Sequence, residues 1–177
     1  MWGCPLARRN DHKMTEYYLK GAPGITHDGL AYAPGNDIKL SIKINIPNLI
    51  LERGCVDVNN KEMIVPGTGF AVNDILHIAA IPEGFVVDFC ECYVHTVNAE
   101  MEAGSAINIE SLSGLYAGIA LDELGSSFET DLEYAAKTHF CANGSYISII
   151  PVLTAVLQAV FTVSFHAYRL RPSLVTE

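Results

Sequence analysis

The stretch from Asn73 to Val97, NDILHIAAIPEGFVVDFCECYVHTV, decides the fold that the sequence predicts. Residues 75–81 are a largely apolar run, which is typical of a buried strand. Pro82-Glu83-Gly84 is a turn signal, and residues 85–97 then predict a second, longer strand. Two apolar strands joined by a tight turn indicate a sheet protein.

Strands are also predicted on both sides of this stretch. Residues 38–46 (IKLSIKINI) and 159–170 (AVFTVSFHAYRL) alternate apolar and polar side chains, which is typical of half-buried strands, and Pro47 ends the first of them. Residues 55–65 predict a hairpin that turns at Asn59-Asn60. Residues 104–111, 114–121 and 143–151 predict short strands, and residues 126–140 are ambiguous between a short helix and a loop. Many short strands favour an all-β, antiparallel β-sandwich of jelly-roll or Greek-key type.

The first 37 residues have a different composition. They are interrupted by glycine, proline and asparagine, and no period of 2 or 3.6 runs through them. We therefore expect an extended N-terminal arm over 1–37 and a β-sandwich domain over 38–177, of which 38–72 is either core or a peripheral hairpin. Met14 is an alternative start to Met1.

Composition limits the possible partners. The chain has 177 residues, half of them apolar, but no uninterrupted apolar run of membrane-spanning length. Residues 1–61 hold eight lysines and arginines against six aspartates and glutamates, whereas residues 62–177 hold three against fourteen. An acidic body repels nucleic acid, so we expect neither nucleic acid nor membrane as a partner.

The N-terminus has no apolar signal core, and five irregularly spaced cysteines indicate reduced thiols in a protein made in the cytoplasm.

Cys90 and Cys92 are the first candidates for chemistry. They are two residues apart on a predicted strand, so both side chains emerge on one face. With His139 and Cys141 they would form a Cys3His set, which suits zinc. Structural zinc sites usually place Cys-x2-Cys on a turn, however, and buried cysteine is common in cores. We expect core cysteines, no metal and no cofactor, and whether the four residues cluster stays open.

No nucleophilic site is predicted. The sequence contains no phosphate-binding loop and no G-x-S-x-G elbow. Cys92 and His95 are an odd number of residues apart, so a strand points them to opposite faces, whereas Glu91 and His95 share a face. We predict no catalytic residues and no enzymatic activity.

The N-terminal segment RRNDHKMTEYYLK is the candidate partner-binding site. It combines residue types that are enriched at interface hot spots. The candidate residues are Arg8, Arg9, Tyr17, Tyr18 and Leu19.

From Asn73 to about residue 170, the chain resembles the capsid cement or decoration proteins of tailed bacteriophages. The residues that carry the resemblance are NDILHIAAIPEGFVV, the small-residue strand AGSAINIE and the closing strand AVFTVSFHAYRL. The resemblance implies a non-enzymatic β-sandwich that binds the major capsid protein on the outer surface of the virion, often as a homotrimer. The first 72 residues depart from a compact decoration module, and we expect the arm to bridge neighbouring subunits.

Two alternatives remain at this point. The chain could be a tail, neck or head-fibre-base component of the virion. It could also be a carbohydrate-binding or cupin-like sandwich, which predicts a metal or an aromatic-lined groove.

Overall fold

A computed structural model of the chain describes residues 13–22, 25–26, 29–30, 37–98, 105–111, 114–122, 124–125, 140–141 and 145–169. Within these ranges almost all regular structure is β, and the single helix is α1 (Ile46–Leu51). No helix in this part of the chain is long and apolar enough to cross a membrane. The all-β fold class is therefore confirmed, while the jelly-roll or Greek-key arrangement stays a prediction.

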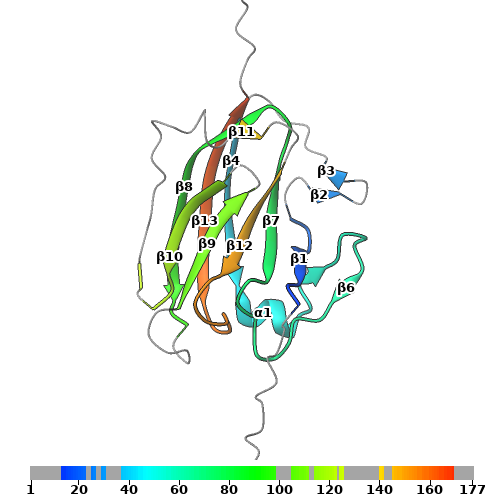
Figure 1. Cartoon of the computed structure of the whole chain (residues 1–177), viewed down its shortest axis with the longest axis vertical. Helices are drawn as coiled ribbons and strands as arrows, with labels where there is room; N and C mark the ends of the chain where they lie inside the picture. The colour runs from blue at the N-terminus through cyan, green and yellow to red at the C-terminus, as the bar shows by residue number, and fades with distance from the viewer. Residues whose placement is uncertain are drawn as a thin grey trace, which may run out of the picture.

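The larger sheet has seven strands in the order β10-β9-β12-β7-β1-β5-β6. Figure 1 shows β10, β9, β12, β7 and β1 side by side, with β7 near the middle. Their bounds are β1 (Glu16–Leu19), β5 (Cys55–Val56), β6 (Glu62–Met63), β7 (Ile75–Ile81), β9 (Ala106–Ser111), β10 (Gly114–Ala120) and β12 (Ser145–Pro151).

The smaller sheet has four strands in the order β11-β8-β13-β4. These are β4 (Asp37–Asn45), β8 (Phe85–Thr96), β11 (Phe140–Cys141) and β13 (Val160–Arg169). β13 pairs with β4 over nine residues and with β8 along almost its whole length, so it is the centre of this sheet. A separate two-stranded ribbon joins β2 (Ile25–Thr26) to β3 (Gly29–Leu30).

The Pro82-Glu83-Gly84 turn connects the two sheets rather than closing a hairpin. β7 belongs to the seven-stranded sheet and β8 to the four-stranded one. Gly84 has φ +80°, a left-handed conformation that a residue with a side chain adopts only with strain. The turn therefore passes the chain across the core from one sheet to the other.

One hydrophobic core lies between the sheets and draws on both. Ile78, Ile107 and Ile149 come from the larger sheet and are almost completely buried. Phe161 and Phe165 come from β13, in the smaller sheet. Alternation along β13 produces this arrangement, because every second residue from Phe161 to Ala167 is buried. The strands predicted at 38–46 and 159–170 are confirmed.

Helix α1 follows β4 directly. The Asn45 side chain caps it by accepting a hydrogen bond from the Asn48 N–H at 3.1 Å, and Pro47 lies in its first turn. Pro47 thus ends the strand as predicted. The hairpin predicted at Asn59-Asn60 is also present, since β5 and β6 pair antiparallel on either side of it.

Two corrections concern β1. Residues 16–19 lie inside the arm predicted over 1–37, yet they form a strand between β7 and β5, so the boundary at residue 37 does not hold for this segment. β1 also pairs parallel with β7, so the larger sheet is mixed and not wholly antiparallel. The many residues between the two strands allow the crossover connection that a parallel pair needs.

Asp74 fixes the position of β1. Its carboxylate accepts hydrogen bonds from the Thr15 N–H at 3.1 Å and from the Ala71 N–H at 2.9 Å, and the residue is almost fully buried. The Asp of the Asn73-Asp74 pair that opens β7 therefore anchors the chain just before β1.

Candidate functional site

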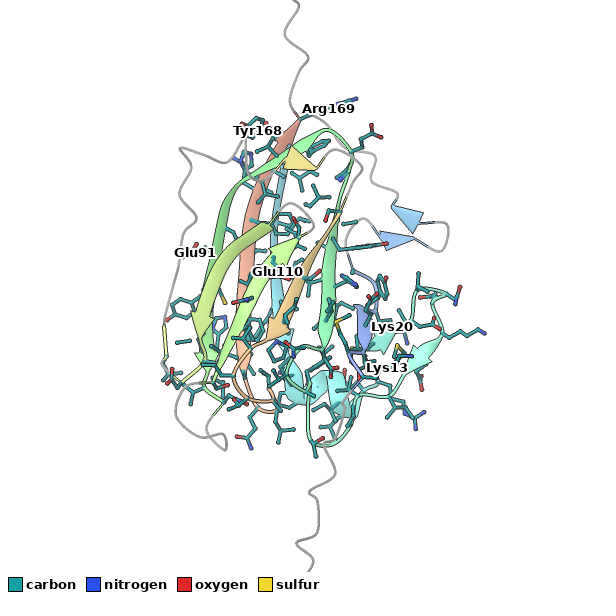
Figure 2. The ribbon with its side chains drawn as sticks, in the orientation of Figure 1. Lys13, Lys20, Glu91, Glu110, Tyr168 and Arg169 are labelled. Atoms are coloured by element: carbon teal, nitrogen blue, oxygen red, sulfur yellow. The ribbon has the colours of Figure 1, made fainter. Side chains whose placement is uncertain are left out.

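A row of polar and aromatic residues crosses the outer face of the seven-stranded sheet. Strand register places Tyr18 opposite His77, His77 opposite Ser148, and Ser148 opposite Glu110. The four residues come from β1, β7, β12 and β9, and we call them the cross-strand row. In Figure 2, Glu110 is labelled over β9, whereas the labelled lysines Lys13 and Lys20 lie at the β1 side of the sheet.

His77 is the centre of the row. Its Nδ1 lies 2.8 Å from Ser148 Oγ, within hydrogen-bond distance. Its Nε2 is buried and has no hydrogen-bond partner, and Glu16 Oε2 is 3.8 Å away, too far for a hydrogen bond. One nitrogen of the ring is therefore satisfied and the other is not.

Three rings pack against one another beside this pair. The ring centroid of His77 is 4.5 Å from that of Tyr18 and 4.7 Å from that of Tyr146, and the two tyrosines meet edge to face at 5.4 Å. Tyr18 is buried and Tyr146 half-buried. The ring faces are occupied mainly by each other, so they offer little flat surface to a guest.

A groove of about 270 Å³ lies over the row. Its volume is slightly below the roughly 300–1,000 Å³ of sites for drug-sized ligands. Among its described lining residues, two carry carboxylates and none is a lysine or arginine. The lining residues are Glu16, Tyr18, Ile75, His77, Glu110, Ser111, Ser145, Tyr146, Ser148 and Ile150.

Burial sets the charge state of His77. Removal from water lowers the pKa of His77, and the nearby Glu16 carboxylate opposes this only in part. Burial also raises the pKa of Tyr18. The imidazole is therefore neutral at pH 7, and both rings stay uncharged.

Serine, histidine and glutamate together suggest acyl transfer, but the geometry favours recognition. A catalytic triad needs the carboxylate to hydrogen-bond and orient the imidazole, and 3.8 Å is too long for that. Ser148 also stands inside a strand that is paired on both sides, where backbone N–H groups are largely committed to the sheet rather than free for an oxyanion.

The structure describes three of the five candidate partner-binding residues and places them in different surroundings. Arg8 and Arg9 lie outside the described residues. Tyr17 is buried edge to face against Phe70, with ring centroids 5.1 Å apart, and Leu19 packs against the core. Tyr18 is the member that the structure brings to the groove. Tyr17 and Leu19 therefore contribute to the chain's own fold in this structure.

The two thiols of the opening stretch are core residues. Cys90 and Cys92 are fully buried, and burial raises the pKa of each thiol to about 12. His139 lies outside the described residues, and Cys141 lies in β11, where its backbone pairs with Phe85 of β8. Among the residues whose placement is described, no three histidine, cysteine or acidic side chains group as metal ligands. The Cys3His set as a whole stays untested.

The prediction that Cys92 and His95 point to opposite faces of their strand is confirmed. Cys92 faces the core, whereas His95 is exposed and its Nε2 lies 2.8 Å from Thr162 Oγ1. The pair cannot act as a dyad, because the two side chains lie on opposite faces of β8.

Sequence reasoning missed His77 and Ser148. They are 71 residues apart in the chain, and each lies in a run that looks apolar. A polar residue within such a run was the one available signal, and it could not indicate which residues would meet.

Comparisons with known proteins leave the family open. A scan against protein-family models found no match, and a search of curated proteins found none either. Among solved structures, the chain is similar to a chain of the structure described as "Capsid of Ralstonia phage GP4". The identity is 12% and the TM-score 0.49, over 78% of this chain and 88% of that chain.

Proposed function

We propose that this chain is a non-enzymatic structural protein of a tailed-bacteriophage virion, and specifically a capsid cement protein. It binds the major capsid protein on the outer surface of the shell and stabilises contacts between neighbouring subunits. The chain self-associates, as a trimer, before or during binding.

One observation carries the proposal. The stretches that resemble cement proteins fall on the framework of the fold, since they form β7, the inter-sheet turn, the start of β8, most of β9 and all of β13. The first residues of the resemblance have a structural role, because Asp74 anchors the chain before β1. The residues that carry the resemblance therefore lie in the two-sheet body, which supports the proposal. We rest the proposal on this and not on the distant structural likeness.

The N-terminal residues are proposed to bridge subunits. Because β1 belongs to the body, the bridging part lies before Lys13 and includes Arg8 and Arg9. Arginine is enriched at interface hot spots, and many weak contacts repeated over a shell add up through avidity. An acidic body keeps the decorated surface soluble.

The experiment is co-sedimentation of the purified chain with empty shells of the phage that encodes it. We expect saturable binding of the full chain, and weaker binding after deletion of residues 1–12 or after Arg8→Ala with Arg9→Ala. The deletion must stop before Lys13, because removing residues 16–19 would take a strand out of the sheet. An exposed pair elsewhere, Lys39→Ala with Lys43→Ala, is the matched control and should leave binding unchanged.

Two outcomes would overturn the proposal. Undiminished binding by the deletion variant contradicts the bridging role of the N-terminal residues. No binding of the full chain to shells, together with its presence at six or twelve copies per particle, would favour the tail or neck alternative.

A further inference from the structure

The buried Nε2 of His77 is the strongest unexplained feature of the described residues. A buried polar atom without a hydrogen bond costs free energy, and such atoms in native structures call for an explanation. His77 is only 9% exposed, and its Nε2 has no hydrogen-bond partner and faces Glu16 Oε2 at 3.8 Å, while its Nδ1 lies 2.8 Å from Ser148 Oγ. His77 is one of the residues that line the groove, and its Nε2 is buried.

The groups around this atom are acceptors. In the tautomer whose Nδ1–H donates to Ser148 Oγ, Nε2 presents a lone pair, and Glu16 Oε2 lies beside it at 3.8 Å. Glu110 adds a second carboxylate where the row ends on β9. Among the described residues, no lysine or arginine forms an ion pair with either glutamate.

A guest that satisfies these acceptors must carry donors and positive charge. Ammonium and guanidinium groups have donors and no acceptor, and charge-assisted hydrogen bonds to carboxylates are the stronger kind. The Glu16 side chain is 51% exposed, so it is free to move aside and then to close over a guest. The small volume suits one side chain better than a whole ligand.

We propose that the groove over the cross-strand row binds a lysine or arginine side chain of a partner protein chain, held between Glu16, Glu110 and Nε2 of His77. Charge complementarity selects this partner, since the described lining residues include two carboxylates and no lysine or arginine. The inference is independent of the proposed function, because the site is a property of the isolated chain.

The test is an NMR titration of the full chain with N-acetyl-arginine amide, followed at the His77 imidazole and assigned with the spectrum of His77→Gln. N-acetyl-citrulline amide, which lacks the charge, is the matched probe. We expect a saturable shift with the arginine compound, at a Kd on the order of millimolar for so small a probe. The ¹⁵N shifts should also show Nδ1 protonated and Nε2 free before the guest is added.

Variants make the assignment specific. Glu16→Gln and Glu110→Gln should each weaken binding by about two- to five-fold. Glu91→Gln, on the outer face of the other sheet, should not (Figure 2). Raising the salt concentration should weaken binding of the charged probe.

Three results would overturn the inference. Equal shifts with the arginine and citrulline compounds would exclude charge recognition. Binding that is unchanged in both glutamine variants would exclude this groove. Tighter binding of free spermidine than of the arginine compound would assign the groove to a polyamine instead of a protein side chain.

Discussion

His77 Nδ1 and Ser148 Oγ lie 2.8 Å apart on neighbouring strands of the larger sheet, joined by a buried hydrogen bond. The bond links β7 to β12 on the face that carries the groove. Because both residues are buried, the bond between them replaces the hydrogen bonds to water that each side chain gives up on folding.

Replacing Ser148 by alanine should therefore cost about 1–3 kcal/mol of unfolding free energy, since it leaves His77 Nδ1 buried without a partner. Urea unfolding followed by circular dichroism measures this. The matched control is Ser41→Ala, which breaks the exposed Ser41–Ser164 hydrogen bond of 2.9 Å. Its cost should stay within about 0.5 kcal/mol, and equal costs for both variants would contradict the buried role of Ser148.

Protonation of His77 should destabilise the fold in mild acid. Burial lowers the pKa of His77, so the unfolded chain takes up this proton at a higher pH than the folded chain does. Stability from this residue is full above about pH 6.5 and is lost as the pH falls below it. The groups that face the ring are Glu16, Tyr18, Tyr146 and Ser148.

The measurement is the urea midpoint between pH 7.5 and 5, compared for the parent chain and for His77→Gln. The variant should show the smaller decline. A decline of the same size in both would assign the acid sensitivity to other groups.

Asn98 holds the segment between β12 and β13. Its side-chain amide donates to Ser105 Oγ at 2.9 Å and to the Ala155 carbonyl at 3.0 Å, and its oxygen accepts from the N–H groups of Leu157 and Gln158 at 3.0 and 2.9 Å. Asn98→Ala should cost about 3 kcal/mol, because these buried groups lose their partner together.

The control for Asn98 is Asn45→Ala, which removes one exposed helix-capping hydrogen bond. That variant should cost about 1 kcal/mol. Chemical denaturation of both proteins gives the comparison, and a loss for Asn98→Ala no larger than for the cap would show that the segment is held by other contacts.

The buried thiols should be unreactive in the folded chain. Burial raises the pKa of Cys55, Cys90 and Cys92 to about 12, so almost no thiolate is present at pH 8. Iodoacetamide labelling with peptide mapping, with and without guanidinium, checks this. Labelling of Cys90 or Cys92 in the native protein at the denatured rate would contradict their placement in the core.

The same thiols predict alkaline sensitivity. In the unfolded chain they ionise near their ordinary pKa of 9.0, whereas the folded chain keeps them protonated up to about pH 12. Their contribution to stability is therefore full below pH 9 and declines as the pH rises through this window. A urea midpoint that stayed constant from pH 8.5 to 10.5 would be inconsistent with three buried thiols.

The strands could be predicted where one face is buried along many residues. β4 and β13 alternate strictly, and the structure buries Ile38, Ile44 and Phe161 from those patterns. The odd spacing between Cys92 and His95 along β8 was also enough to predict that their side chains lie on opposite faces of the strand. Local patterns of this kind predict which face of one strand is buried, but not which strands lie beside it.

The position of β1 and the cross-strand row could not be predicted in the same way. β1 has four residues, too few for a period to show, and it is held by pairing with β7 and β5 and by a hydrogen bond between Thr15 and Asp74 across 59 residues. The row depends on the register of four strands that are far apart in the chain. Such contacts follow from the assembled sheet and not from any segment alone.

Cryo-electron microscopy of intact particles of the phage that encodes the chain tests most directly whether the chain decorates the shell. We expect density for the two-sheet body on the outside of the shell, at symmetry-related positions and in hundreds of copies. Density confined to the tail or neck at six or twelve copies, or absence of the chain from the particle, would contradict it.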